Sequence, residues 1–150
     1  MPETITTSEL SGFLNGVVQR LAEPQASDIL SKWNDHLADD LGQGFLDSQS
    51  PGGIAWAPLK HPRPPGHNPG TRPLIDTGKL MQSVISNGSG HIETVTQEST
   101  LFGTSVFYAA FHQYGTGTIP ARPFIGISED LQDSAAEKLG DHIMTVIDAI

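Results

Sequence analysis

Histidine is the side chain that most often binds metals or transfers protons near neutral pH, and the sequence contains six. Only His61 and His67 lie close together, six residues apart in a proline-rich stretch. No HExxH motif occurs, and no two histidines stand at the i, i+4 spacing of a helix. The sequence therefore predicts no metal site and no cofactor. His112, between Phe111 and Tyr114 on a short amphipathic segment, is interpreted as a packed, hydrogen-bonded side chain.

A second candidate for chemistry is Asp76, in the string Leu-Ile-Asp-Thr-Gly at 74–78. Aspartic proteases present their catalytic carboxylate after two aliphatic residues in this way, and Phe-Ile-Gly at 124–126 is an echo of the aliphatic pair that such enzymes keep before glycine. The chemistry needs two aspartates that share one proton, and so a second copy of the motif or a homodimer. Lys79 stands where a small residue is needed, which favours Asp76 or Thr77 as a helix cap instead. A dimeric aspartic protease that uses Asp76 is kept as an alternative.

Other catalytic and phosphate-binding patterns are incomplete. The chain has no cysteine and no GxSxG string, so two common kinds of nucleophile site are missing. The glycine-rich segment 115–118 lacks both the GK[ST] ending and a following helix. Four of the eight Lys and Arg residues fall within 60–79, and we interpret this stretch as a contact for acidic helices of a neighbouring copy. Arg122, between Ile-Pro-Ala and Pro-Phe, is expected to order a loop or an interface.

Composition and charge narrow the class of protein. A chain of 150 residues suits one domain, so 1–150 is treated as a single unit. Its net charge of −9 argues against a general nucleic-acid binder. The lack of cysteine and of any long apolar run indicates a reducing compartment and no membrane span. The hydrophobic share of 37% is low for a compact domain, which predicts parts that are extended or covered by partners.

The hydrophobic pattern predicts the elements that position these residues. Apolar residues three or four apart indicate helices over 8–21, 24–45, 77–85, 107–114 and 128–150. Runs typical of strands occupy 91–97, 100–106 and 124–127, with the first two paired as a hairpin. Seven of the eleven prolines lie within 51–73, so 48–73 is predicted to be an extended loop. The predicted fold class is α+β, with N-terminal helices and a long C-terminal helix packed on a small antiparallel sheet.

Four strings, read together, resemble a known family. They carry the patterns S-P-x-G-x-x-W-x-P-L, L-x-x-T-G-x-L, Y-A-x-x-H-Q-x-G and I-P-A-R-P-F-x-G, and they lie at 50–59, 74–80, 108–115 and 119–126. In this order and spacing the chain resembles the phage virion morphogenesis, or tail-completion, family over about residues 8–148. One departure is the Pro- and His-rich stretch 60–73, where members of the family often have a Thr- or Lys-rich segment.

The resemblance implies a structural protein of the virion without catalytic residues. Such proteins act late in tailed-phage assembly, in the host cytoplasm, as a ring of identical subunits, here expected to be hexameric. The implied neighbours are neck, connector, tail-terminator or tail-tube proteins, with genome DNA passing only through the lumen. The acidic helix faces are expected to line that channel and to repel DNA. A tail terminator or a head-side connector is the near alternative, and an acidic inhibitor of a host factor is a third.

Two long loops with apolar residues are what docking between subunits needs. Trp56→Ala is therefore expected to cost assembly more than monomer folding, and Arg122→Ala to weaken the ring. The residues expected to contact subunits or neck neighbours are Trp56, Pro58, Leu59, Arg63, Arg72, Tyr108, His112, Ile119, Pro120, Arg122 and Phe124.

Overall fold

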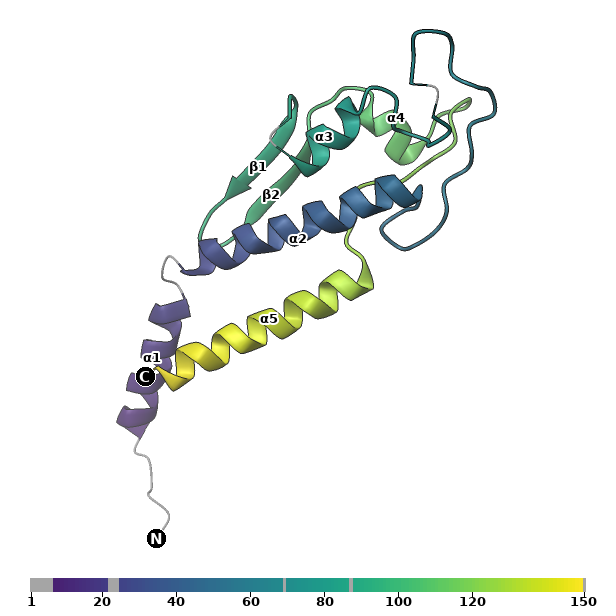
Figure 1. Ribbon diagram of the computed structural model, residues 1–150. Coiled ribbons are helices and arrows are strands. Elements are labelled where there is room, and N and C mark those ends of the chain that lie inside the picture. The colour runs from purple at the N-terminus through teal and green to yellow at the C-terminus, as the bar shows by residue number, and fades with distance from the viewer. Residues whose placement is uncertain (1–6, 22–24, 69, 87, 150) are drawn as a thin grey trace.

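The computed structural model describes residues 7–21, 25–68, 70–86 and 88–149 and shows an α+β arrangement of five helices and one two-stranded sheet within these ranges (Figure 1). None of the helices in these ranges is long and apolar enough to cross a bilayer. The elements, in chain order, are α1 (Thr7–Leu21), α2 (Gln25–Asp47), α3 (Lys79–Ile85), β1 (His91–Val95), β2 (Thr100–Thr104), α4 (Ala109–Tyr114) and α5 (Glu129–Asp148).

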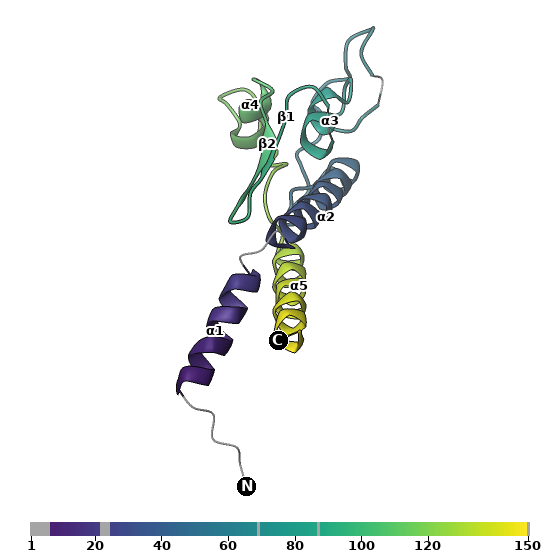
Figure 2. The same cartoon turned by 90° about the vertical axis from the view of Figure 1, so that its left-hand side faces the viewer.

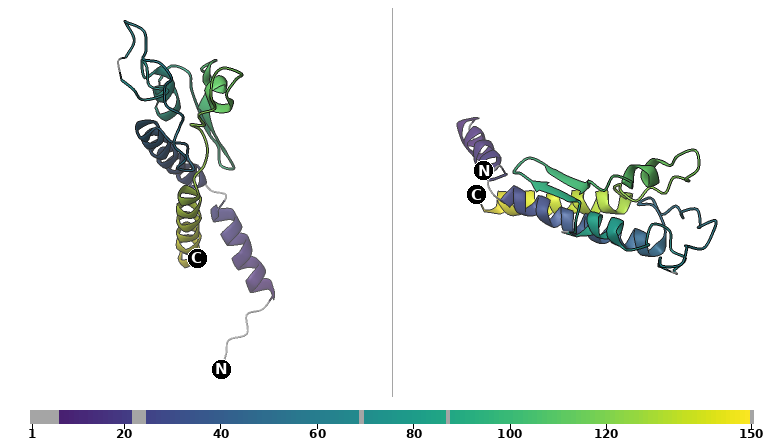
Figure 3. Two further views of the ribbon diagram at one scale, coloured as in Figure 1. Left: turned by 90° about the vertical axis from the view of Figure 1, so that its right-hand side faces the viewer. Right: turned by 90° about the horizontal axis from the view of Figure 1, so that it is seen from above.

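Helix α2 forms the centre of the molecule. The hairpin and α3 pack on one side of it, and α5 runs antiparallel to it on another side (Figures 1 and 3). Its apolar stripe buries Leu37, Leu41 and Phe45, while Asp35 and Asp39 stay exposed to water. The buried hydrophobic core consists of Leu37, Leu41, Phe45, Trp56, Leu80, Val84, Ala109, Phe124 and Leu131.

The antiparallel hairpin is confirmed, with strands shorter than expected. His91 pairs with Thr104 and Val95 with Thr100, so β1 and β2 each end before the predicted limits at 97 and 106. Asn34 of α2, 1% exposed, ties the sheet to the helix. Its Nδ2 donates to Glu93 Oε1 at 2.8 Å, and its Oδ1 accepts from Thr100 Oγ1 at 3.0 Å. This buried amide fixes where the hairpin sits along α2.

The predicted strand at 124–127 is wrong. This segment is extended but has no strand beside it within the described part of the chain. The Gln113 side chain binds the backbone of 124–125 instead. Its Oε1 accepts from the N–H groups of Phe124 and Ile125 at 3.0 and 3.1 Å. Gln113 Nε2 donates to the Ile125 carbonyl at 2.9 Å. One amide side chain thus satisfies the backbone groups that a neighbouring strand would otherwise bind.

The ends of the helices show which of the predicted capping residues are present. Ser128 caps α5 as expected, since its Oγ accepts from the Leu131 N–H at 3.1 Å. Gly115 ends α4 with φ 75°, and a Cβ there would lie 2.8 Å from the Ala121 nitrogen. The predicted cap of α3 by Asp76 or Thr77 is confirmed only in part. The N-cap residue is Gly78, with φ 81° and no side chain to cap the helix, but Thr77 Oγ1 accepts from the N–H of Lys79, the first residue of α3, at 3.3 Å.

The loop prediction for 48–73 is confirmed, and the start of this loop packs on the chain's own core. Trp56 is 7% exposed, and its ring meets Phe45 edge to face, with 5.6 Å between centroids. Trp56 Nε1 donates to the Pro123 carbonyl at 2.8 Å. This bond joins the two long loops, 48–73 and 115–123, on which the candidate contact residues lie.

Candidate interaction sites

A cleft of about 400 Å³ brings together five of the eleven residues expected at an interface. It opens between the proline-rich loop, the segment that leads into α3, and α4 with the loop after it. We call it the cationic cleft, because three positively charged side chains line it. Its lining residues are Leu59, Arg63, Leu74, Asp76, Thr77, Gly78, Lys79, Leu80, Tyr108, His112 and Arg122.

Arg122 is the most buried of the three cations that line the cationic cleft and is 6% exposed. Its Nε donates to the Ala57 carbonyl at 2.7 Å and its Nη2 to the Pro58 carbonyl at 3.0 Å. These bonds confirm that Arg122 orders a loop. Within the described residues no carboxylate is paired with it, and desolvation lowers the pKa of its guanidinium. A buried cation that is stabilised only by carbonyl dipoles can also bind an anion.

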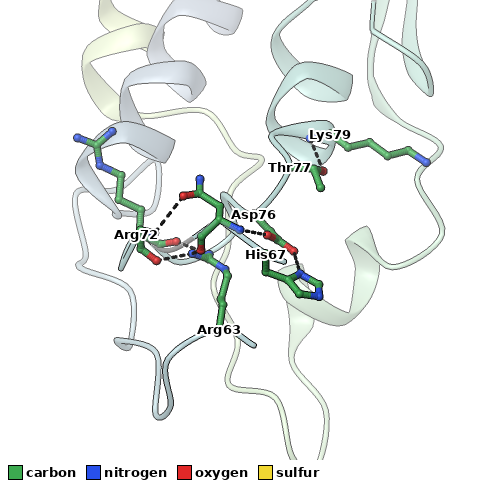
Figure 4. Close-up of polar contacts among 8 residues, drawn as sticks. Arg63, His67, Arg72, Asp76, Thr77 and Lys79 are labelled. Atoms are coloured by element: carbon green, nitrogen blue, oxygen red, sulfur yellow. Dashed lines mark hydrogen bonds and ion pairs between the residues drawn. The ribbon is translucent and has the colours of Figure 1, made fainter. Parts of the chain in front are cut away.

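Arg63 holds the outer part of the same loop in a similar way (Figure 4). Its Nη1 donates to the Gly70 carbonyl and its Nη2 to the Arg72 carbonyl, both at 2.6 Å. The Arg72 side chain is exposed and does not line the cationic cleft; this residue contributes its carbonyl instead. The four cations of 60–79 therefore do not form one patch. Two of them, Arg63 and Lys79, line the cleft.

Asp76 is the one carboxylate among the described residues that line the cationic cleft, and both of its oxygens bind the loop (Figure 4). Oδ2 lies 2.5 Å from His67 Nδ1, and Oδ1 accepts from the Asn68 N–H at 2.9 Å. The hydrogen bond with His67 is the main reason that the pKa of Asp76 lies below its usual value; the Asn68 N–H adds to it. Asp76 thus fastens the loop to the start of α3. The described residues contain no group of three metal-ligating side chains.

His112 is packed as expected, but one of its ring nitrogens lacks the expected hydrogen bond. Its ring stands edge to face on Tyr108, with 6.1 Å between centroids. Nδ1 is buried and has no hydrogen-bond partner in the described structure. Burial, and secondarily the charge of Arg122, lower the pKa of His112, which favours the neutral ring.

The other expected contact residues do not gather on one surface. Trp56 and Phe124 are buried in the core of their own chain, so their burial needs no neighbour. A role of Trp56 in contacts with another subunit stays a prediction. Ile119 and Pro120 are half-buried in the turn after α4, and Pro58 is exposed. Contacts of these three residues with another subunit stay a prediction.

A second surface, the apolar groove, lies between α2 and α5 and was missed by sequence reasoning. Its volume is about 530 Å³, and Trp33 of α2 and Leu139 of α5 are among the residues that line it. The predicted fold packed the helices on the sheet and did not indicate a groove between them. The low hydrophobic share of the chain was the signal that they could not all be covered. The lining residues are Ile29, Leu30, Lys32, Trp33, His36, Leu131, Ser134, Ala135, Lys138 and Leu139.

Helix α1 adds to this uncovered apolar surface. It extends away from the body and lies beside the C-terminal end of α5 (Figure 2). None of its described side chains is buried, and Leu10, Leu14 and Val18 are 47, 52 and 63% exposed. These residues share one face of the helix. Apolar faces of this extent on a small protein mark contacts with other proteins.

Comparison with known proteins gives two matches. The model of the phage virion morphogenesis family matches residues 5–144. The Mu-like prophage FluMu G protein 1 of Haemophilus influenzae is 31% identical over 112 residues, which is 69% of this chain and 69% of that protein. No solved structure matches.

Proposed function

The chain belongs to the phage virion morphogenesis family, and from this we propose that it is a structural subunit of a tailed-phage virion that forms a homo-oligomeric ring at the neck. In this role the ring completes the tail and makes it competent to join the DNA-filled head. The ring is proposed to be hexameric. The family points to a structural rather than an enzymatic role in virion assembly.

The observation that carries the ring proposal is the apolar surface that the folded chain leaves in water. One face of α1 is exposed along its length, and the apolar groove between α2 and α5 is open. The hydrophobic effect favours covering both. Two different uncovered surfaces on one chain suit head-to-tail contacts, in which one surface of a subunit meets the other surface of the next. Such contacts close into a ring when the rotation from one subunit to the next divides a full turn.

Location and partners follow from the same proposal. The protein would be present in the host cytoplasm during assembly and in the neck of the finished virion, next to connector and tail-terminator or tail-tube proteins. Genome DNA would pass through the lumen without being bound. The exposed acids Asp28, Asp35 and Asp39 on one face of α2 would line that lumen and repel phosphate. A neutral or basic lumen in the assembled ring would contradict this part.

The first test is the solution mass of the purified protein by light scattering across a range of concentrations. A ring-sized oligomer, or a monomer that becomes one when tails or connectors are added, supports the proposal. A dimer of constant mass would contradict it and would return attention to the protease alternative.

A second test separates tail completion from tail termination. Phage lacking the protein should accumulate filled heads and unjoined tails of normal length if the protein completes tails. Tails of uncontrolled length would instead identify a terminator. Retention of the protein in purified particles is the control against an inhibitor of a host factor, which would not be packaged.

A further inference from the structure

The charges around the cationic cleft do not balance within the described part of the chain. Arg63, Lys79 and Arg122 contribute three positive charges, and Asp76 contributes one negative charge. Both oxygens of Asp76 already accept hydrogen bonds from 67–68. The cleft therefore retains an excess of two positive charges, with one of the cations, Arg122, almost completely buried.

The donors left over define the chemistry of a ligand. A guanidinium has five N–H groups, and only Nε and Nη2 of Arg122 have acceptors among the described residues. Nη1 of Arg122 has no acceptor there. Lys79 is exposed at the rim, and its ammonium points away from the Asp76–His67 pair (Figure 4). A planar anion with two oxygens suits the partly free guanidinium of Arg122, and Lys79 lines the same cleft with a second positive charge; a carboxylate has this shape and charge.

The same chain carries a matching acidic surface on α5. At about 100° of rotation per residue, five acids of this helix fall within an arc of about 80°. All five side chains are exposed, and none makes an ion pair within the described ranges. We call this surface the acidic stripe; it consists of Asp130, Asp133, Glu137, Asp141 and Asp148.

The two surfaces face different ends of the molecule. The cationic cleft lies at the end with α4 and the long loops, whereas α5 runs from there to the opposite end beside α1 (Figures 1 and 3). The C-terminal half of the acidic stripe is thus remote from the cleft of its own chain. Contact of that half with a cleft requires two copies, and it joins unlike surfaces, as a ring does.

We propose that the cationic cleft binds carboxylates of the acidic stripe of a second copy of this chain, with Arg122 and Lys79 as the receiving cations. This proposal rests on the proposed self-association and names the contact that makes it. The charge complementarity favours a protein carboxylate over a nucleic-acid phosphate, because a chain of net charge −9 repels DNA.

The test uses charge reversal at one residue of each surface in the full-length chain. Lys79→Glu places a carboxylate at the cleft, and Asp141→Lys places a cation in the stripe. Each variant alone should associate at least about tenfold more weakly than the parent in sedimentation velocity, because like charges then meet. An equimolar mixture of the two should regain association, since the reversed cleft fits the reversed stripe. The double variant K79E/D141K should behave like the mixture.

Matched controls use the same charge changes outside the two surfaces. Lys60→Glu and Glu98→Lys alter exposed residues that line neither the cleft nor the stripe, and both should associate like the parent. Thermal unfolding of the variants checks that each chain is folded. Association of the parent should also weaken as salt rises from about 0.05 to 0.5 M.

The outcomes separate this proposal from the one it rests on. If the parent chain never forms oligomers, even with tails or connectors, the proposed ring fails and this contact with it. If the parent associates but the single reversals do so equally well, or the mixture gains nothing, the contact is wrong and the ring stands. Should Lys79→Glu change binding of inorganic phosphate or of a DNA duplex but not the mass, the cleft serves a free anion and the proposal is overturned.

Discussion

The body of the molecule and its two outer helices bury their apolar residues to different degrees. In the body, Phe45 and Val84 have no exposed surface. In α1 none of the described side chains is buried. Among the described side chains of α5, Leu131 alone is buried. Both outer helices nevertheless carry regular apolar stripes. The body is thus packed within one chain, and in the proposed ring the outer helices would bury their stripes against other chains.

The strongest test of this comparison places one substitution in each region. Phe45→Ala should lower the free energy of unfolding by about 3–5 kcal/mol, because it opens a cavity beneath Trp56 and Phe124. Phe13→Ala in α1 should lower it by less than about 0.5 kcal/mol at concentrations where the chain is monomeric. Urea unfolding of both variants measures the two values. Equal losses would show that α1 belongs to the cooperative body.

Trp56 sharpens the comparison, because sequence reasoning assigned it to the contact surface and the structure places it in the body. Trp56→Phe keeps most of the ring but removes the hydrogen bond to the Pro123 carbonyl. We expect a loss of about 1–3 kcal/mol in the free energy of unfolding. Oligomer formation at temperatures where the chain stays folded should be unchanged. Loss of assembly in a fully folded Trp56→Phe chain would restore its interpretation as an anchor for a neighbour.

Gln113→Leu tests the segment 124–125, whose backbone groups are bound by the Gln113 side chain and not by a neighbouring strand. The substitution leaves two N–H groups and one carbonyl of 124–125 without their partner. The expected loss is about 1–3 kcal/mol, reduced where water reaches the freed groups. Hydrogen exchange at the amides of Phe124 and Ile125 should accelerate selectively. Exchange that stays slow there would mean that packing of 124–125, not the amide of Gln113, holds this segment.

The elements that sequence reasoning predicted correctly depend on local signals. Ser128 caps α5 from within one turn, and Gly115 follows α4 because its backbone needs positive φ. The hairpin follows from two β-like runs separated by a few residues. The failed strand prediction at 124–127 involves a partner farther along the sequence. Gln113 takes the role of a strand for 124–125, eleven or twelve residues away.

The candidate site was predictable as residue types but not as an arrangement. Arg122 was recognised as a cation in a rigid apolar setting, and its bonds to Ala57 and Pro58, 65 and 64 residues away, confirm that it orders a loop. Nothing in the sequence indicated that Arg63 and Arg122 would line one cleft while Arg72 would not. The apolar groove was missed for a related reason. Helical spacing shows that a stripe exists but not what covers it.

Leu14→Glu has a small expected effect on the monomer and a large one on assembly. Leu14 is about half exposed, so a charge there should change the free energy of unfolding of the monomer by less than about 0.5 kcal/mol. Oligomers should be lost, since the charge would have to be buried against a neighbour. Gln19→Glu, on the opposite face of α1, is the matched control and should assemble normally. Normal assembly of Leu14→Glu would remove α1 from the proposed contacts.

The smallest expected effect is that of pH on the loop fastened by Asp76. The pKa of Asp76 is lower in the folded chain than its unperturbed value of 3.8, chiefly through His67. The stabilisation from its ionised form is therefore complete above the unfolded pKa and is lost as pH falls through the folded pKa. Protease cleavage within 60–73, which measures opening of the loop, should increase below about pH 4 in the parent chain.

Asp76→Asn separates this loop effect from the alternative use of the same carboxylate. The variant should show open-loop cleavage already at neutral pH and little further change on acidification, because the titrating group is gone. Its assembly should stay nearly intact, since Asp76 fastens a loop of its own chain. A proteolytic activity of the parent that disappears in Asp76→Asn would instead assign a catalytic role to this carboxylate. That result would place chemistry in the cationic cleft and not only contact with a neighbouring subunit.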